Sequence, residues 1–230
     1  MRDDICTIPI SEIFEVSDGC PICRMRDTVE KHLLEYILGD AMMEPDVRIL
    51  TNQKGFCGRH YEKLLSQRGR LQLALILQTH LDEINKRVFS NRAPRKQALR
   101  SVSEITGGCF LCEKTEWGMS RLISTVYRSY ENEEDFRAMF NSQPAFCLPH
   151  YEMLMLGADR RVMRKHGKEF EDNLLRIAKG YSEELYGKIS QYCGMYDYRS
   201  LRSQEDMEKC KNSVEQSITF LNAEMGVNDE

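Results

Sequence analysis

Two copies of one metal-ligand pattern constrain the fold of this chain more than any other feature. In the first copy, a Cys-x-x-Cys motif at residues 20–23 precedes a Cys-x-x-His motif at residues 57–60. In the second copy, the same two motifs lie at residues 109–112 and 147–150. Each copy supplies three thiolates and one imidazole, a complete tetrahedral ligand set for zinc. The predicted ligands of the first site are Cys20, Cys23, Cys57 and His60, and those of the second site are Cys109, Cys112, Cys147 and His150.

The ligand chemistry favours two structural zinc ions per chain, one in each copy. Three thiolates and an imidazole fill a tetrahedron, whereas a catalytic zinc usually keeps one position for water. An iron–sulfur cluster stays open as an alternative, because Cys and His can ligate such clusters. A redox dithiol is disfavoured because no βαβ pattern surrounds either Cys-x-x-Cys motif. Disulfides would need an oxidising compartment, which nothing in the sequence indicates.

The repeat extends beyond the ligands and predicts an internal duplication. At an offset of 89 residues, the apolar positions Leu33, Leu34 and Ile37 fall on other apolar residues. One extra residue then enters the second copy, and the offset becomes 90. At this offset the identical matches are Gln53 with Gln143, Phe56 with Phe146, Tyr61 with Tyr151, Glu62 with Glu152 and Leu64 with Leu154. The repeat is too long for a solenoid unit of roughly 20–50 residues.

Apolar residues recur at helical spacing through most of the chain, so we expect an all-α, predominantly helical fold. Clear examples are the stripes over residues 25–37, 71–88 and 170–189. Periodicity is lost at residues 90–103, where Asn91 and Pro94 favour the boundary between the copies. We therefore expect a first helical repeat over residues 1–95 and a second over 96–230, the second carrying an additional C-terminal helix.

The local sequence indicates how each ligand pair is held. Two cysteines separated by two residues can aim both sulfurs at one ion across a tight turn, which Pro21 pre-sets in the first copy. Each Cys-x-x-His motif leads into a helical pattern, so its two ligands share a face of the first turn. The helix N-terminus there also favours thiolate over thiol.

These motifs resemble a treble-clef zinc finger, in which a cysteine knuckle and a helix N-terminus share one zinc. The segment between the ligand pairs departs from that family, because it reads as helix where the treble clef has a β-hairpin. The complete chain is similar to an uncharacterised family of duplicated bacterial proteins with the pattern Cys-x-x-Cys…Phe-Cys-x-x-His-Tyr. That resemblance implies metal binding and supplies no activity.

Composition limits the location and the partners of the chain. The formal net charge is −4, which argues against the whole surface binding nucleic acid. The N-terminus lacks the apolar stretch of a signal peptide, and no apolar run reaches the ~18 residues of a membrane span. We therefore expect a cytoplasmic protein without a membrane partner. One local basic stretch is a candidate phosphate-binding surface, and its residues include Arg92, Arg95, Lys96 and Arg100.

Three functional hypotheses follow from the sequence. The first is a binding, adaptor or regulatory protein in which zinc is purely structural and the partner is a protein or a nucleic acid. The second is a sensor whose thiols or metal respond to oxidation or to metal supply. The third is an enzyme with a site between the repeats. No P-loop, dinucleotide-binding fingerprint, nucleophile elbow or zincin motif is present, so an enzyme is the least favoured of the three.

Overall fold

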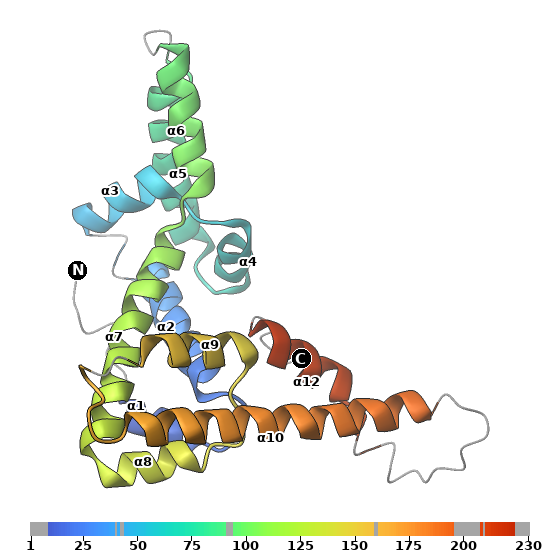
Figure 1. Ribbon diagram of the computed structural model, residues 1–230. Coiled ribbons are helices and arrows are strands. Elements are labelled where there is room, and N and C mark those ends of the chain that lie inside the picture. Colours follow the sequence, from blue (N-terminus) through green and yellow to red (C-terminus); the bar gives the residue numbers. More distant parts are fainter. Residues whose placement is uncertain are drawn as a thin grey trace. The chain divides into compact units, whose positions relative to one another are not determined.

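A computed structural model describes residues 9–39, 41, 44–90, 94–158, 161–195, 208 and 210–223. Within this described part the chain forms helices and loops and contains no β-strand, which confirms the predicted all-α class (Figure 1). No described helix is both long and apolar enough to cross a lipid bilayer. The helices are α1 (Ile10–Glu15), α2 (Pro21–Leu38), α3 (Pro45–Lys54), α4 (Gly58–Ser66), α5 (Arg70–Arg87), α6 (Arg95–Gly107), α7 (Phe110–Asn132), α8 (Glu134–Asn141), α9 (Leu148–Gly157), α10 (Gly167–Gly194) and α12 (Ser213–Asn222).

The apolar stripes of the sequence are the buried faces of these helices. In α2, Val29, Leu33 and Ile37 recur every four residues, and all three are buried. In α10, Phe170 and Leu174 are buried in the same way. Residues four apart lie on one face of an α-helix, so each stripe packs as a unit and leaves the charged face to solvent.

The segment 90–103, in which we expect the boundary between the copies, is helical from Arg95 onward. There α6 begins, and it continues to Gly107. Pro94 precedes the first turn, where its missing N–H costs nothing. The sequence showed no apolar periodicity here because α6 buries little: Ser101 is its one fully buried residue, and Leu99 is 58% exposed. A helix with so little buried surface gives a weak sequence signal.

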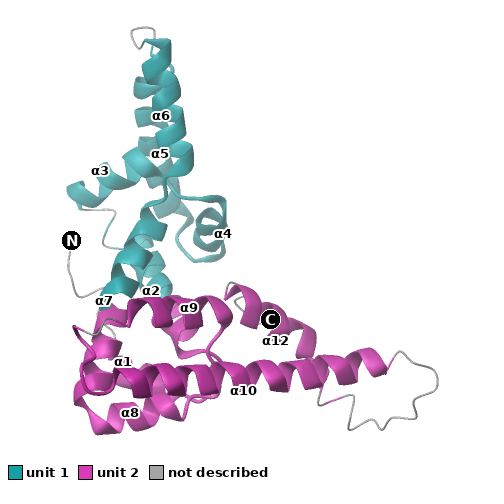
Figure 2. Cartoon of the chain, in the orientation of Figure 1, with its two compact units in different colours: residues 1–8, 28–121 teal, residues 9–27, 122–230 magenta. Residues whose placement is uncertain are grey.

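The chain divides into two compact units (Figure 2). Unit 1 comprises residues 1–8 and 28–121, and unit 2 comprises residues 9–27 and 122–230. These bounds differ from the expected repeats 1–95 and 96–230, because each unit takes in segments from both copies of the ligand pattern. The divisions fall inside α2 and α7, where no change in sequence pattern marks them.

Unit 2 is built around a cluster of aromatic rings. Phe140 on α8 lies at its centre, with ring centroids 4.9 Å from Phe146 and from Phe170 and 5.1 Å from Tyr130. Phe14 on α1 lies 5.7 Å from the same ring. All five side chains are at most 1% exposed. Large aromatic rings bury extensive surface and favour tilted or edge-on contacts, so this cluster is the main apolar core of the unit.

Unit 1 has a smaller apolar core and more polar packing. α3 lies against α5, where Val47, Leu73 and Ile76 are buried. A hydrogen-bond chain joins the same two helices, with Thr79 Oγ1 donating to Asn52 Oδ1 at 2.8 Å. Among the described residues of this unit, the aromatic ring pair is Phe56 with Tyr61, a T-shaped contact with ring centroids 5.5 Å apart. Hydrogen bonds to charged or polar partners therefore supply much of the specificity of this unit.

Candidate metal centres

The structure gathers the eight predicted ligands into two clusters, one in each unit. The inner cluster, in unit 1, consists of Cys57, His60, Cys109 and Cys112. The outer cluster, in unit 2, consists of Cys20, Cys23, Cys147 and His150. In each cluster the ligand atoms all lie within 4.8 Å of one another, so each cluster could hold a metal ion.

The pairing of the motifs differs from the one that we expected. Each cluster takes its Cys-x-x-Cys motif from one copy of the pattern and its Cys-x-x-His motif from the other copy. The prediction that each copy forms its own site is therefore wrong, although the three-thiolate, one-imidazole composition is the same. In the inner cluster, Cys109 follows His60 by 49 residues. In the outer cluster, Cys147 follows Cys23 by 124 residues, so the inner ligands lie between these two in the sequence.

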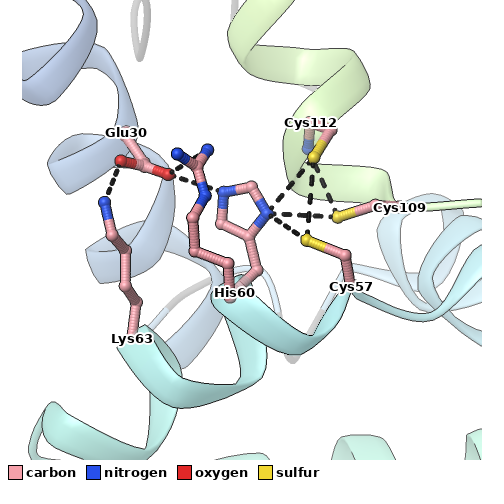
Figure 3. A network of polar contacts seen from close by, with 7 residues as sticks. Glu30, Cys57, His60, Lys63, Cys109 and Cys112 are labelled. Carbon is pink, nitrogen blue, oxygen red and sulfur yellow. Dashed lines mark hydrogen bonds and ion pairs between the residues drawn. The ribbon is translucent and has the colours of Figure 1, made fainter. Parts of the chain in front are cut away.

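The inner cluster surrounds the Nδ1 atom of His60 (Figure 3). This atom lies 3.2 Å from the sulfurs of Cys57 and Cys109 and 3.4 Å from that of Cys112. The sulfurs of Cys57 and Cys112 are 3.8 Å apart, and the three cysteines of this cluster are free thiols. His60 is completely buried, whereas Cys57 and Cys112 are half-buried.

The outer cluster has the same composition and similar spacing. His150 Nδ1 lies 3.0 Å from the sulfur of Cys147, 3.3 Å from that of Cys23 and 3.7 Å from that of Cys20. The sulfurs of Cys23 and Cys147 are 3.6 Å apart. Cys147 and His150 are buried, and Cys23 alone of the three cysteines is half-buried.

These separations fit a tetrahedral ion. Zinc lies about 2.3 Å from a cysteine sulfur and about 2.0–2.1 Å from a histidine nitrogen. A tetrahedron with these bond lengths has edges of roughly 3.8 Å between sulfurs and roughly 3.5 Å between sulfur and nitrogen. The measured sulfur–sulfur separations are 3.6 and 3.8 Å, and the sulfur–nitrogen separations run from 3.0 to 3.7 Å. Both clusters can therefore take up a metal ion with little rearrangement.

All four ligand motifs lie at the N-termini of helices. The first residue of each motif directly precedes a helix, and the second ligand lies in the first turn. The helices concerned are α2, α4, α7 and α9. The expectation for the Cys-x-x-His motifs agrees with this geometry, but the Cys-x-x-Cys motifs also begin helices and do not form separate knuckles. Two helix N-termini therefore face each cluster, and their partial positive charges favour the thiolate form that metals bind.

A backbone contact joins the two segments of the inner cluster. The N–H of Phe110 donates to the carbonyl of Gly55 at 3.0 Å, which places the Cys109 motif beside the Cys57 motif. Gly55 has φ +60°, and a Cβ atom there would lie 2.7 Å from Nε2 of His80. His80 Nδ1 lies 2.7 Å from the carbonyl oxygen of Asn52. Only glycine fits this close approach without strain, because a side chain would meet the buried imidazole.

A buried carboxylate holds the far side of the inner histidine. Oε1 of Glu30 lies 2.7 Å from His60 Nε2, and Glu30 is only 3% exposed (Figure 3). Lys63 contacts the other carboxylate oxygen, and Arg59 lies 3.3 Å from the first. A carboxylate on the second nitrogen fixes the ring orientation of a metal-binding histidine and directs its other nitrogen to the metal.

The network keeps Glu30 ionised. Burial raises the pKa of Glu30, but hydrogen bonds from His60 and Lys63, together with the charges of Lys63 and Arg59, lower it to about 2. Burial lowers the pKa of His60, but its contacts with the Cys109 sulfur and with Glu30 raise it to about 9. Without a metal, His60 therefore favours its protonated form. A metal ion held by this cluster would take the place of the proton on Nδ1.

Two thiols of the inner cluster, Cys109 and Cys112, have pKa values that are shifted in opposite directions. Burial raises the pKa of the Cys109 thiol, but the hydrogen bond from His60 and nearby backbone donors lower it to about 6. Burial and the neighbouring Cys109 sulfur raise the pKa of Cys112 to about 12. Three thiolates so close together repel one another, and a divalent cation is the group that stabilises all three at once.

The outer cluster shows the same division. Burial raises the pKa of Cys20, but hydrogen bonds with Cys147, Cys23 and His150 bring it well below its ordinary value. The hydrogen bonds with Cys147 and Cys20 raise the pKa of Cys23, and burial adds to this effect. The contact with Cys20 raises the pKa of Cys147 to about 12. The outer cluster thus holds one thiolate readily and needs a cation to hold the other two.

The residues that support the inner histidine have no charged counterparts in the second copy of the pattern. At the repeat offsets of 89 and 90, Glu30 corresponds to Met119, Arg59 to Pro149 and Lys63 to Met153.

Sequence reasoning missed Glu30, although one signal was available. Glu30 stands three and four residues before Leu33 and Leu34, on the buried face of α2. An acid on an apolar helix face needs a buried partner.

The basic residues predicted as a phosphate-binding surface lie at the start of α6. Arg95, Lys96 and Arg100 are exposed there. Arg92 lies outside the described residues. These side chains belong to unit 1, but none is a member of the inner cluster.

A family model described as a family of unknown function, DUF6062, matches residues 1–228, so the chain belongs to that family. Searches among curated proteins and among solved structures found no match. The fold and site thus define an all-α protein with two candidate Cys₃His metal centres.

Proposed function

We propose that this protein is a binding or adaptor scaffold in which each helical unit is held by one structural zinc ion. The observation that carries the proposal is the convergence of four helix N-termini on two closed Cys₃His clusters. Four protein ligands complete the tetrahedron of zinc and leave no position for a substrate or for an activated water. A cytoplasmic location, which keeps thiols reduced, fits this chemistry.

The identity of the metal rests on the donor set. Thiolates select soft or borderline ions, and tetrahedral sulfur–nitrogen sites are typical of zinc. Binding of a structural zinc is coupled to folding and contributes on the order of 10 kcal/mol per site. Two such ions account for the stability of helical units that contain segments distant in sequence.

Metal stoichiometry in two double variants tests both the zinc sites and their crossed pairing. Cys23→Ser combined with Cys147→Ser removes two ligands of the outer cluster and leaves the inner cluster whole. Elemental analysis should then give one zinc per chain, against two for the unchanged protein. Cys23→Ser combined with Cys57→Ser damages both clusters, and zinc should fall to zero.

Cys193→Ser is the matched control, because Cys193 is an exposed cysteine of α10 outside both clusters. Its zinc content should stay at two per chain. If each copy of the pattern held its own ion, the two double variants would exchange their results. Iron with a visible chromophore in the purified protein would contradict the zinc assignment itself.

A second candidate function, a thiol-responsive sensor, is favoured by the exposure of the inner cluster. Two of its cysteines, Cys57 and Cys112, are half-buried, against Cys23 alone in the outer cluster. Accessible zinc thiolates are the ones that an oxidant reaches first. Zinc release under mild peroxide, with oxidation mapped to Cys57 and Cys112 before Cys20 and Cys147, would support the sensor. Full retention of zinc under the same conditions would contradict the sensor function and support the purely structural role of zinc.

A further inference from the structure

A basic groove lies between the end of α5 and the start of α6, in unit 1. Its volume is about 900 Å³. An ion pair from Arg87 to Glu104, 2.7 Å long, joins the two helices along it. The lining residues are Lys86, Arg87, Ser90, Pro94, Lys96, Gln97, Arg100, Ser101 and Glu104.

The charge of this lining is strongly positive. Four of the residues are cationic, and Glu104, already paired with Arg87, is the one acid among them. Lys86 pairs with Asp82 on its own helix. No Asp or Glu occurs between residues 86 and 100. A groove with such an excess of positive charge concentrates anions.

Lys96 and Arg100 carry the clearest sign of an external ligand. They stand four residues apart on α6, so their side chains lie on the same face of the helix and repel each other. Neither takes part in an ion pair among the described residues, and both are exposed. An anion between them would relieve the repulsion, and two cations at this spacing suit neighbouring phosphates.

A second basic stretch of the chain lacks this character. Arg164, Lys165 and Lys168 line a hollow of about 600 Å³ at the start of α10, but Glu171 and Asp172 line it too. The carboxylate of Glu131 already accepts hydrogen bonds from the backbone N–H groups of residues 164–166. Acids within the chain therefore compensate this stretch, and it serves as a control for the groove.

An exposed aromatic residue is next in sequence to a residue that lines the groove. Phe89 directly precedes the lining residue Ser90 and is 71% exposed. An aromatic ring beside a positive groove is the combination by which proteins bind single strands, with phosphates in the groove and a base stacked on the ring. An acidic peptide would satisfy the cations but would not use an exposed ring in this way.

We propose that the groove binds the phosphate backbone of single-stranded nucleic acid and that Phe89 stacks on a base. This inference names a partner for the proposed scaffold and rests on that function. The two fail separately, because zinc content tests the scaffold and oligonucleotide affinity tests the groove. Neutral donors from Gln97 and Ser101 supply hydrogen bonds that do not depend on base identity. Binding should therefore be strong at low salt and largely independent of sequence.

Fluorescence anisotropy with labelled poly(dT) and poly(U) oligonucleotides, measured on the zinc-loaded full chain over a salt series, tests the groove. Lys96→Glu with Arg100→Glu should weaken binding about tenfold or more, and lower the slope of log affinity against log salt by about 1.4 for two lost phosphate contacts. Phe89→Ala should weaken binding about tenfold with an unchanged slope, because stacking is not ionic.

Lys165→Glu with Lys168→Glu is the matched control, since it makes the same change of charge in the compensated stretch. Its affinity should stay within about twofold of the unchanged protein, as expected for a surface that makes no phosphate contact. Helicity and zinc content are measured on every variant to confirm the fold. The proposal is overturned if the unchanged protein binds no oligonucleotide at low salt. Equal losses in both charge-reversal variants, or full competition by polyglutamate, would overturn it too.

Discussion

The inner and outer clusters have the same ligands but different surroundings. In unit 1, the inner histidine is held by Glu30, which in turn contacts Arg59 and Lys63. The positions equivalent to these three residues in the second copy are Met119, Pro149 and Met153, none of which is charged. Identical coordination chemistry can therefore be supported by quite different neighbours.

The cores of the two units differ in a parallel way. Unit 2 has its aromatic cluster around Phe140, whereas unit 1 combines a small apolar core with hydrogen bonds and ion pairs. Burial of large rings stabilises a unit whether or not a metal is bound. A carboxylate behind a metal-binding histidine acts by raising the affinity of the site for its metal. We infer that unit 1 depends on its metal more than unit 2 does.

The largest expected effect comes from removing one ligand in each unit. Cys109→Ser should abolish metal binding at the inner cluster and unfold unit 1, because the lost coupling is on the order of 10 kcal/mol. Cys147→Ser should act on unit 2, where the aromatic core preserves part of the helical structure. Hydrogen exchange measured by mass spectrometry reports the two units separately.

The crossed pairing decides which helices respond to these variants. In Cys109→Ser, α3, α4 and α5 should lose protection while α8 and α10 keep theirs, since the inner cluster belongs to unit 1. Loss of protection in α8 and α10 instead would mean that Cys109 serves a site within its own copy.

The next effect concerns the aromatic core. Phe140→Ala removes the ring that contacts Phe14, Tyr130, Phe146 and Phe170, and should destabilise unit 2 by about 3–5 kcal/mol. Thermal unfolding with zinc in excess measures it. Phe89→Ala is the control, because that ring is exposed and should change stability by less than about 0.5 kcal/mol. An equally small loss of stability in Phe140→Ala would contradict the proposal that the aromatic core stabilises unit 2.

A smaller effect is expected at the carboxylate behind the inner histidine. Glu30→Gln should lower zinc affinity at the inner cluster about 10–100-fold and leave the outer cluster unchanged, because the amide orients the imidazole less strongly. Competition with a chromophoric chelator gives the two affinities. Glu35→Gln is the control, since Glu35 is exposed on the same helix. Equal affinities in the two variants would show that Glu30 does not position His60.

The smallest effect concerns a carboxylate of unit 2. Glu131 accepts three backbone N–H groups just before α10, and although the slight burial raises its pKa, these hydrogen bonds lower it overall. A lowered folded-state pKa contributes stability that is present above the unfolded-state value and is lost as the pH falls through the folded-state value. Glu131→Gln should therefore reduce this part of the acid dependence. Unfolding of both proteins by urea between neutral and acid pH measures it, and identical pH profiles would contradict the capping role.

The sequence predicted the helices and the identity of the clustered residues for physical reasons. Val29, Leu33 and Ile37 recur every four residues, which places them on one face of an α-helix. This spacing of apolar residues is what predicts the helical class. The eight Cys and His residues stand out because they occur as two pairs of matching motifs. Glu30 escaped notice because a single acid on an apolar stripe does not show which partner compensates it.

The pairing of the motifs could not be read from the sequence. Either Cys-x-x-Cys motif is chemically able to combine with either Cys-x-x-His motif. Nearness in sequence favours the local pairing only weakly, since each doubling of a closed loop costs about 0.6 kcal/mol. Packing contacts such as the Phe110–Gly55 hydrogen bond outweigh so small a difference. The crossed pairing also explains the unit boundaries inside α2 and α7, because each unit contains one motif from each copy.

The nested arrangement has a consequence for synthesis on the ribosome. Had each copy formed its own site, the first ion could be captured as soon as His60 emerged. In the observed pairing, Cys57 and His60 wait until Cys112 completes the inner cluster, whereas Cys20 and Cys23 wait for His150, which follows 38 residues later. At about 5–20 residues per second, that interval is roughly 2–8 s. The nascent chain thus passes through a stage in which the thiols of the first copy lack the partners with which they could hold a metal ion.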